Sequence, residues 1–134
     1  MPEQSFEAGI DTLHIMLAWL REQLLQQVAA AKVLQIEMAT EEALVNVINY
    51  AYGQKGGRVI LDANLSKEGW LTLVLKDFGP PFNPLSVEKP DLNLSLEERK
   101  IGGLGVFMMR QLMDGIEYQR EPGQNVLTLR KKIV

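Results

Sequence analysis

The sequence contains no cysteine. A disulfide framework, a thiolate zinc site and a cysteine nucleophile are therefore excluded. The sequence also lacks any run of 18 apolar residues, and its acidic N-terminus, MPEQSFEAGID, has no apolar core of the kind found in export signals. We therefore expect a cytoplasmic protein that does not cross or bind a membrane.

Charge of one sign is never concentrated in this sequence. The 14 lysines and arginines are balanced by 17 aspartates and glutamates, and no run of five like charges occurs. Binding to a nucleic-acid backbone needs clustered basic residues, so we do not expect nucleic acid as a direct partner. The length of 134 residues and the 46% hydrophobic content predict one core and a single domain over residues 1–134.

Periodicity predicts the order of the elements along the chain. Apolar residues recur at helical spacing over residues 11–27, 29–52 and 104–115, and at strand spacing over residues 58–66, 70–78, 116–121 and 125–134. The strands come in adjacent pairs and the helices stand apart from them. This order predicts an α/β fold, a two-layer α/β sandwich whose mostly antiparallel mixed sheet is covered by helices on one face.

A long segment without clear periodicity separates the second predicted strand from the third predicted helix. Its sequence, GPPFNPLSVEKPDLNLSLEERKIGG, contains four prolines. Segments of this length inside a compact domain are more often functional lids than passive connections. We therefore predict a lid over about residues 80–102.

Three polar residues share one face of the second predicted helix. Glu42, Asn46 and Asn49 are spaced by four and three residues. A solvated helix face would explain an isolated pair of this kind. Asparagine is a poor helix former, however, and it occurs twice here. An amide oxygen can bind a hard cation, and a carboxylate one turn away can accept a proton, so the pattern suits a magnesium nucleotide.

A carboxylate closes the second predicted strand in LKDFGPP. Asp77 and Gly79 could form an ordinary turn. Alternatively, the Asp77 carboxylate could accept a hydrogen bond from an exocyclic amine such as that of adenine, and Gly79 would let a flat ring approach the backbone.

The third motif is glycine-rich. In IGGLGVFMMR, three glycines lead directly into a predicted helix. The N–H groups of such a helix start can bind phosphate, although glycines also occur there for conformational reasons alone. The motif is not a Walker loop, because GxxxxGK[ST] is absent, and it is not a Rossmann turn, because no strand precedes it.

The ordered set of these motifs resembles the Bergerat-fold (GHKL) ATPase superfamily, and most closely its anti-sigma-factor serine-protein kinases. The residues from Glu42 to Asn46 resemble the N-box of that family. Asp77-Phe78-Gly79 resembles its first glycine box, and Gly103-Leu104-Gly105 resembles its second. The resemblance covers nearly the whole chain.

The resemblance implies ATP and Mg²⁺ as cofactors and a role for each motif. Asn46 would bind Mg²⁺, Glu42 would be the catalytic base for a target serine, and Asp77 with Gly79 would bind adenine. The remaining nucleotide-binding residues would be Asn49 after the N-box, Thr128 at the adenine pocket, and Gly103, Gly105, Val106 and Phe107 along the phosphates. The implied partners are a sigma factor and a STAS-domain anti-anti-sigma protein, with a possible homodimer.

Two departures from the family pattern keep a second function open. Pro81 replaces the second glycine of the first box, and Asn49 and Tyr50 stand where many relatives have a basic residue. A non-catalytic ATP-binding module that sequesters its partner stoichiometrically is therefore the alternative to a kinase. A detached half of a histidine kinase is disfavoured, because no acidic residue follows His14.

Overall fold

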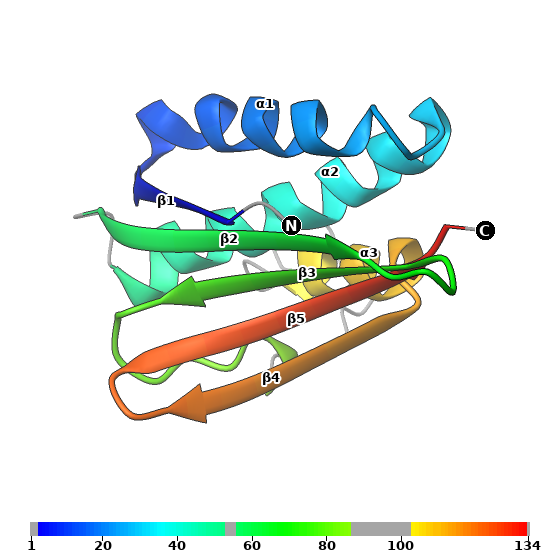
Figure 1. The fold of residues 1–134 in the computed structure, drawn as a ribbon. Coiled ribbons are helices and arrows are strands. Elements are labelled where there is room, and N and C mark those ends of the chain that lie inside the picture. The colour runs from blue at the N-terminus through cyan, green and yellow to red at the C-terminus, as the bar shows by residue number, and fades with distance from the viewer. Residues whose placement is uncertain (1–2, 53–55, 87–102, 134) are drawn as a thin grey trace.

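The structure is a computed structural model, and it describes residues 3–52, 56–86 and 103–133. Its elements form two layers, a sheet and a set of helices (Figure 1). The strands are β1 (Glu3–Ala8), β2 (Gly57–Leu65), β3 (Trp70–Asp77), β4 (Gly115–Glu121) and β5 (Gln124–Lys132). The helices are α1 (Leu13–Leu24), α2 (Ala30–Asn46) and α3 (Gly103–Leu112), with short turns at Ile10–Thr12, Val47–Ala51 and Pro84–Ser86.

The sheet has the strand order β1-β2-β3-β5-β4, and each of these pairings is antiparallel. The α/β sandwich predicted from the sequence is therefore confirmed, although the described sheet has no parallel pair and is not mixed. In β3, Leu71, Leu73 and Leu75 are buried while the residues between them are partly exposed. This period of two turns one face of the sheet towards the core.

All three helices lie on one side of the sheet (Figure 1). Helix α1 buries Met16, Leu20 and Leu24, which are spaced by four residues and so share one face. Helix α2 buries a longer stripe along the sheet that includes Ile36 and Leu44. In the described part of the chain, no helix is both long enough and apolar enough to cross a membrane.

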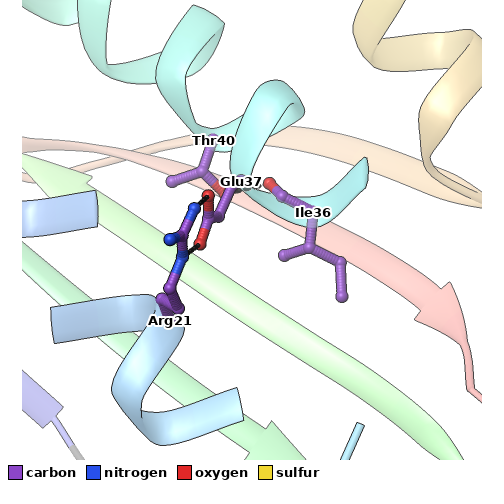
Figure 2. A network of polar contacts seen from close by, with 4 residues as sticks. All are labelled: Arg21, Ile36, Glu37 and Thr40. Carbon is purple, nitrogen blue, oxygen red and sulfur yellow. Dashed lines mark hydrogen bonds and ion pairs between the residues drawn. The ribbon is translucent and has the colours of Figure 1, made fainter. Parts of the chain in front are cut away.

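An ion pair joins α1 to α2 on the side away from the sheet. The guanidinium of Arg21 donates through Nε and Nη2 to the two carboxylate oxygens of Glu37, and the Nη2–Oε2 distance is 2.7 Å (Figure 2). In the next turn of α2, the buried Thr40 hydroxyl donates to the carbonyl of Ile36 at 2.7 Å. The pair fixes the lateral position of α1 on α2, because a bidentate contact tolerates little rotation of either helix.

The N-terminal strand β1 was not predicted. Its sequence, EQSFEA, is polar, and it pairs only with β2, so it forms one edge of the sheet. Edge strands need little apolar alternation because one side of them is open to solvent, and this explains why the periodicity did not reveal it.

The strand order determines which motifs can meet. β4 is the next strand after β3 in the sequence, but β3 pairs with β5. The C-terminal end of β3 therefore lies beside the start of β5. Asp77 is therefore directly opposite Asn125. At the same end of the molecule α2 finishes in a π-helical turn, Val47–Ala51. Such turns often occur at functional sites.

Candidate functional site

A small cavity lies between α2 and the end of the sheet where Asp77 and Asn125 meet. Its volume is about 10 Å³. Its walls come from α2 and its π-helical turn, from β3, β4 and β5, and from the segment after β3; the lining residues are Ala43, Asn46, Val47, Leu75, Asp77, Phe82, Pro84, Tyr118, Asn125 and Leu127. The structure thus brings two predicted site residues, Asn46 and Asp77, to one enclosed point.

Asp77 has one carboxylate oxygen that is held and one that is available. Oδ1 accepts hydrogen bonds from the Gly79 N–H at 3.0 Å and from Asn125 Nδ2 at 2.9 Å. Within the described residues, no hydrogen bond reaches Oδ2. Burial raises the pKa of the Asp77 carboxyl above its usual range, although the bonds from Asn125 and Gly79 and the charge of Arg120 oppose this shift. Asp77 is therefore a fixed acceptor facing the cavity.

Asn125 holds Asp77 in place and was not predicted as a site residue. Its Nδ2 donates to Asp77 and also to the Pro80 carbonyl at 2.9 Å. Its Oδ1 accepts from the Phe82 N–H at 3.1 Å and from the Tyr118 hydroxyl at 2.5 Å. All four hydrogen-bonding positions of this amide are thus used, which fixes its orientation.

Asn46 has a buried amide nitrogen without a partner. The residue is 4% exposed, and in residues 3–52, 56–86 and 103–133 its Nδ2 is the buried side-chain atom that lacks a hydrogen bond. An unpaired buried polar group is costly unless a ligand completes it. A half-turn of the amide would place Oδ1 at the same point, where it could bind a cation. The Asn46 amide therefore fits a nucleotide-bound Mg²⁺.

Glu42 lies one turn before Asn46 and faces the start of α3. A Cβ atom added to Gly105 would be 2.2 Å from Glu42 Oε2, so the carboxylate packs directly against the backbone of α3. Burial, and then the negative charge of Glu41, raise the pKa of Glu42. A carboxylate with a raised pKa is a stronger base when ionised, which suits proton abstraction.

Replacing Gly105 with alanine should displace the Glu42 carboxylate, because the new methyl group would occupy its position. The side chain of Glu42 can move, so we expect the melting temperature to change little. Any activity that depends on Glu42 should fall by about tenfold or more. Gly115→Ala is the matched control, since its Cβ would make only an ordinary 3.6 Å contact with Arg130.

The predicted glycine-rich residues lie at the start of α3. Gly103, Gly105, Val106 and Phe107 all fall in the first five residues of this helix. N–H groups in the first turn of an α-helix have no carbonyl partner within the helix, and the helix dipole attracts anions there. The part of the predicted lid from residue 87 to 102 lies outside the described residues.

One predicted residue, Thr128, is placed differently from the expectation. Thr128 pairs with Val74 and Glu117, three positions along β5 from Asn125, so its side chain lies on the opposite face of the sheet from Asp77. Asn49 lies in the π-helical turn and is not among the residues that line the small cavity, and its contact with the nucleotide stays a prediction.

Gly79 has a structural role that the sequence did not suggest. A Cβ at this position would lie 2.7 Å from the carbonyl oxygen of Ala51, at the end of the π-helical turn. The Gly79 carbonyl accepts a hydrogen bond from Arg120 Nη1 at 2.8 Å. Beside it, the Tyr52 hydroxyl accepts from the Phe78 N–H at 2.7 Å and donates to the Arg58 carbonyl at 2.5 Å. The turn after Asp77 is therefore fixed from both sides.

The sequence did contain a signal for Asn125. In NVLTL, Leu127 and Leu129 alternate as core residues, so Asn125 must share their face and Thr128 cannot. The sequence could not show that β5 pairs with β3, because β4 lies between these two strands in the chain.

Comparison with known proteins places the chain in a family. Residues 6–131 match the family model described as the histidine kinase-like ATPase domain. The chain is 29% identical over 114 residues to the serine/threonine-protein kinase BtrW of Bordetella bronchiseptica, which corresponds to 84% of this chain and 80% of BtrW. It is 31% identical over 104 residues to the anti-sigma F factor of Clostridium acetobutylicum, or 72% of this chain and 67% of that protein.

A solved structure of the RsbU and RsbW domains of Rv1364c from Mycobacterium tuberculosis has a similar fold. The TM-score is 0.66 at 19% identity, and the match covers 99% of this chain and 33% of the other. At this identity the likeness concerns the fold, and it agrees with the two-layer α/β arrangement described above.

Proposed function

This chain belongs to the histidine kinase-like ATPase domain family, and on that basis we propose that it is an ATP-dependent protein serine kinase of the anti-sigma-factor type. Its proposed substrate is a serine on a STAS-domain antagonist, and its proposed second partner is a sigma factor. A homodimer is part of the same proposal, because it follows from the family resemblance.

One observation carries this proposal. The Asp77 carboxylate, with one oxygen hydrogen-bonded, and the Asn46 amide, with an unpaired nitrogen, line the same buried cavity. Glu42 lies one helical turn before Asn46. The Asp77 acceptor suits the amino group of adenine, and the Asn46 amide suits an Mg²⁺ bound to the triphosphate. The partly buried carboxylate of Glu42 suits a base for a serine hydroxyl. An ordinary structural helix would have no reason to leave the Asn46 amide unsatisfied.

Each of these residues has a separate role in the proposed reaction. Asp77 would bind the base of the nucleotide, Asn46 would hold the cation, and the N–H groups of the first turn of α3 would bind the phosphates. As the serine oxygen attacks the γ-phosphorus of ATP, Glu42 would accept the serine proton, the bond to the oxygen that bridges the β- and γ-phosphates would break, and ADP would leave. Bound ATP supplies the phosphoryl group that is transferred. In such reactions the protein contributes mainly positioning and charge stabilisation, which these fixed groups can provide.

The pH dependence of transfer should report on Glu42. Because Glu42 must be ionised to accept a proton and its pKa is raised, we expect the loss of activity on acidification to begin at a higher pH than for an ordinary glutamate. Glu41→Gln should shift this loss towards lower pH, since the Glu41 charge contributes to the raised pKa. A pH profile of single-turnover transfer in both proteins measures the shift, and coincident profiles would contradict the assignment.

The proposed function is tested in two steps. Titration with ATP and Mg²⁺ should show saturable binding, and labelled phosphate should then appear on a serine of a STAS-domain protein from the same genome. Absence of nucleotide binding under all conditions would refute the proposal.

A non-catalytic regulator is the second candidate. The observation that favours it is the small size of the cavity, together with Pro81 in the turn that follows Asp77. This candidate predicts nucleotide or partner binding in a defined stoichiometry without transfer to any STAS-domain protein. The same transfer assay separates it from the kinase.

A further inference from the structure

The adenine site suggested by Asp77 is filled by the protein's own chain. Phe82 and Pro84 line the cavity from the segment that follows β3, and Pro84 is buried. The remaining volume of about 10 Å³ has room for one water molecule at most. Sites for small organic ligands usually measure about 300–1,000 Å³. Among the described residues, the polar groups therefore suit a nucleotide, whereas the space between them does not.

We propose that residues 80–86 form an autoinhibitory plug, which occupies the nucleotide-base site through Phe82 and Pro84 and must leave before ATP can bind. This inference rests on the proposed function, and it adds a regulatory step to that function. The plug and the nucleotide compete for one site, so the position of the plug sets the fraction of molecules that are competent to bind.

The plug is an ordered segment with its own hydrogen bonds. Asn125 binds it on both sides of Pro81, through the Pro80 carbonyl and the Phe82 N–H. Asn83 then closes a short turn, in which its Oδ1 accepts from the Leu85 N–H at 2.9 Å and its carbonyl accepts from the Ser86 hydroxyl at 2.7 Å. These contacts hold the segment in the cavity in one defined conformation.

An aromatic pair closes the outer side of the plug. The Phe82 and Tyr50 rings stack with centroids 5.3 Å apart and planes inclined by 22°. Tyr50 belongs to the π-helical turn that follows Asn46. Release of Phe82 would therefore expose the face of the Tyr50 ring that it now covers. The π-helical turn would lose this contact whenever the plug leaves the cavity.

The competition has a measurable consequence. When a protein binds its ligand only from an open state, the apparent dissociation constant equals the intrinsic constant divided by the open fraction. Phe82→Ala removes the largest part of the plug and one half of the aromatic stack. We expect it to tighten MgATP binding by about tenfold, as it would if the closed state were favoured by a similar factor in the wild-type protein.

The experiment compares MgATP affinity, measured by calorimetry, in the wild type, Phe82→Ala and Phe78→Ala. Phe78 is a matched control, because it is an aromatic residue just before the plug that is 42% exposed and packs under Arg58, outside the cavity. Tyr50→Leu tests the stack from the other side, at a residue that is 38% exposed and outside the buried core. Tighter binding in Phe82→Ala and Tyr50→Leu, but not in Phe78→Ala, supports the plug.

A measurement without nucleotide separates this inference from the proposed function. Nuclear Overhauser contacts between the Tyr50 and Phe82 rings should be present in the nucleotide-free protein and should disappear at saturating MgATP. Unchanged or weaker binding in Phe82→Ala, or ring contacts that persist in the complex, would overturn the plug while leaving the kinase proposal intact. If neither the wild type nor Phe82→Ala binds ATP, the proposed function itself fails.

Discussion

Replacing Glu42 with glutamine is expected to slow phosphate transfer by a factor of about 10² to 10⁴, which is the usual contribution of a general base. The substitution preserves the size of the side chain and its packing against Gly105, but it removes the group that accepts the serine proton. MgATP affinity should stay close to that of the wild type, because Glu42 does not line the cavity between Asn46 and Asp77. Single-turnover transfer and calorimetric binding measure the two quantities separately.

The adjacent Glu41→Gln variant is the control for this experiment. It removes the same charge one position away, from a side chain that is exposed. Transfer at neutral pH should be nearly unchanged in this variant. Transfer at the wild-type rate in Glu42→Gln would show that another group takes the proton, or that positioning alone accounts for the rate.

Replacing Asp77 with asparagine is expected to weaken ATP binding by about ten- to a hundredfold, the value of a lost hydrogen bond to a charged group. The asparagine oxygen can still accept from the Gly79 N–H and from Asn125. Its amide nitrogen would then face the cavity and oppose the amino group of adenine, since both are donors. The preference for ATP over GTP should shrink as well, because the oxygen of guanine at this position is an acceptor.

The same variant should be at least as stable as the wild type near neutral pH. The pKa of Asp77 is raised in the folded protein, so its contribution to stability is present at low pH and is lost as the pH rises through the folded-state pKa. Asparagine avoids this loss because it carries no charge. Thermal unfolding at several pH values measures the difference, which should narrow on acidification.

Asp62→Asn provides the matched control for Asp77. Asp62 lies on β2 and alternates with the buried Leu61 and Ala63, so it occupies the face of the sheet away from the helices. ATP affinity should be unaffected there. Equal losses of affinity in Asp62→Asn and Asp77→Asn would indicate that net charge, and not the geometry of the site, governs binding.

Most of the secondary structure could be predicted because burial imposes a period on the sequence. The helix at residues 29–52 and the hairpin of β2 and β3 have long apolar patterns, and both were located closely. β1 escaped prediction because an edge strand needs little alternation. The π-helical turn at the end of α2 also has no periodic signature, so the change of helical geometry after Asn46 was not visible in the sequence.

In the site, too, the local arrangement could be predicted and the long-range contacts could not. Glu42 and Asn46 are four residues apart on one helix, so helical geometry alone aligns them. Asp77 and Asn125 are 48 positions apart, and only the pairing of β3 with β5 brings them together. Thr128 has a hydroxyl that could serve an adenine pocket, but it lies on the face of β5 opposite to Asn125 and Asp77.

By itself, the sequence determined the chemical groups of the site and the elements that carry them, because local periodicity and residue type are properties of the chain alone. The tertiary structure decided that Asn125 holds Asp77, that β1 completes the sheet, and that Phe82 and Pro84 fill the space beside them. These features depend on contacts between segments far apart in the chain, and such contacts are selected by the packing of the whole core rather than by any local pattern.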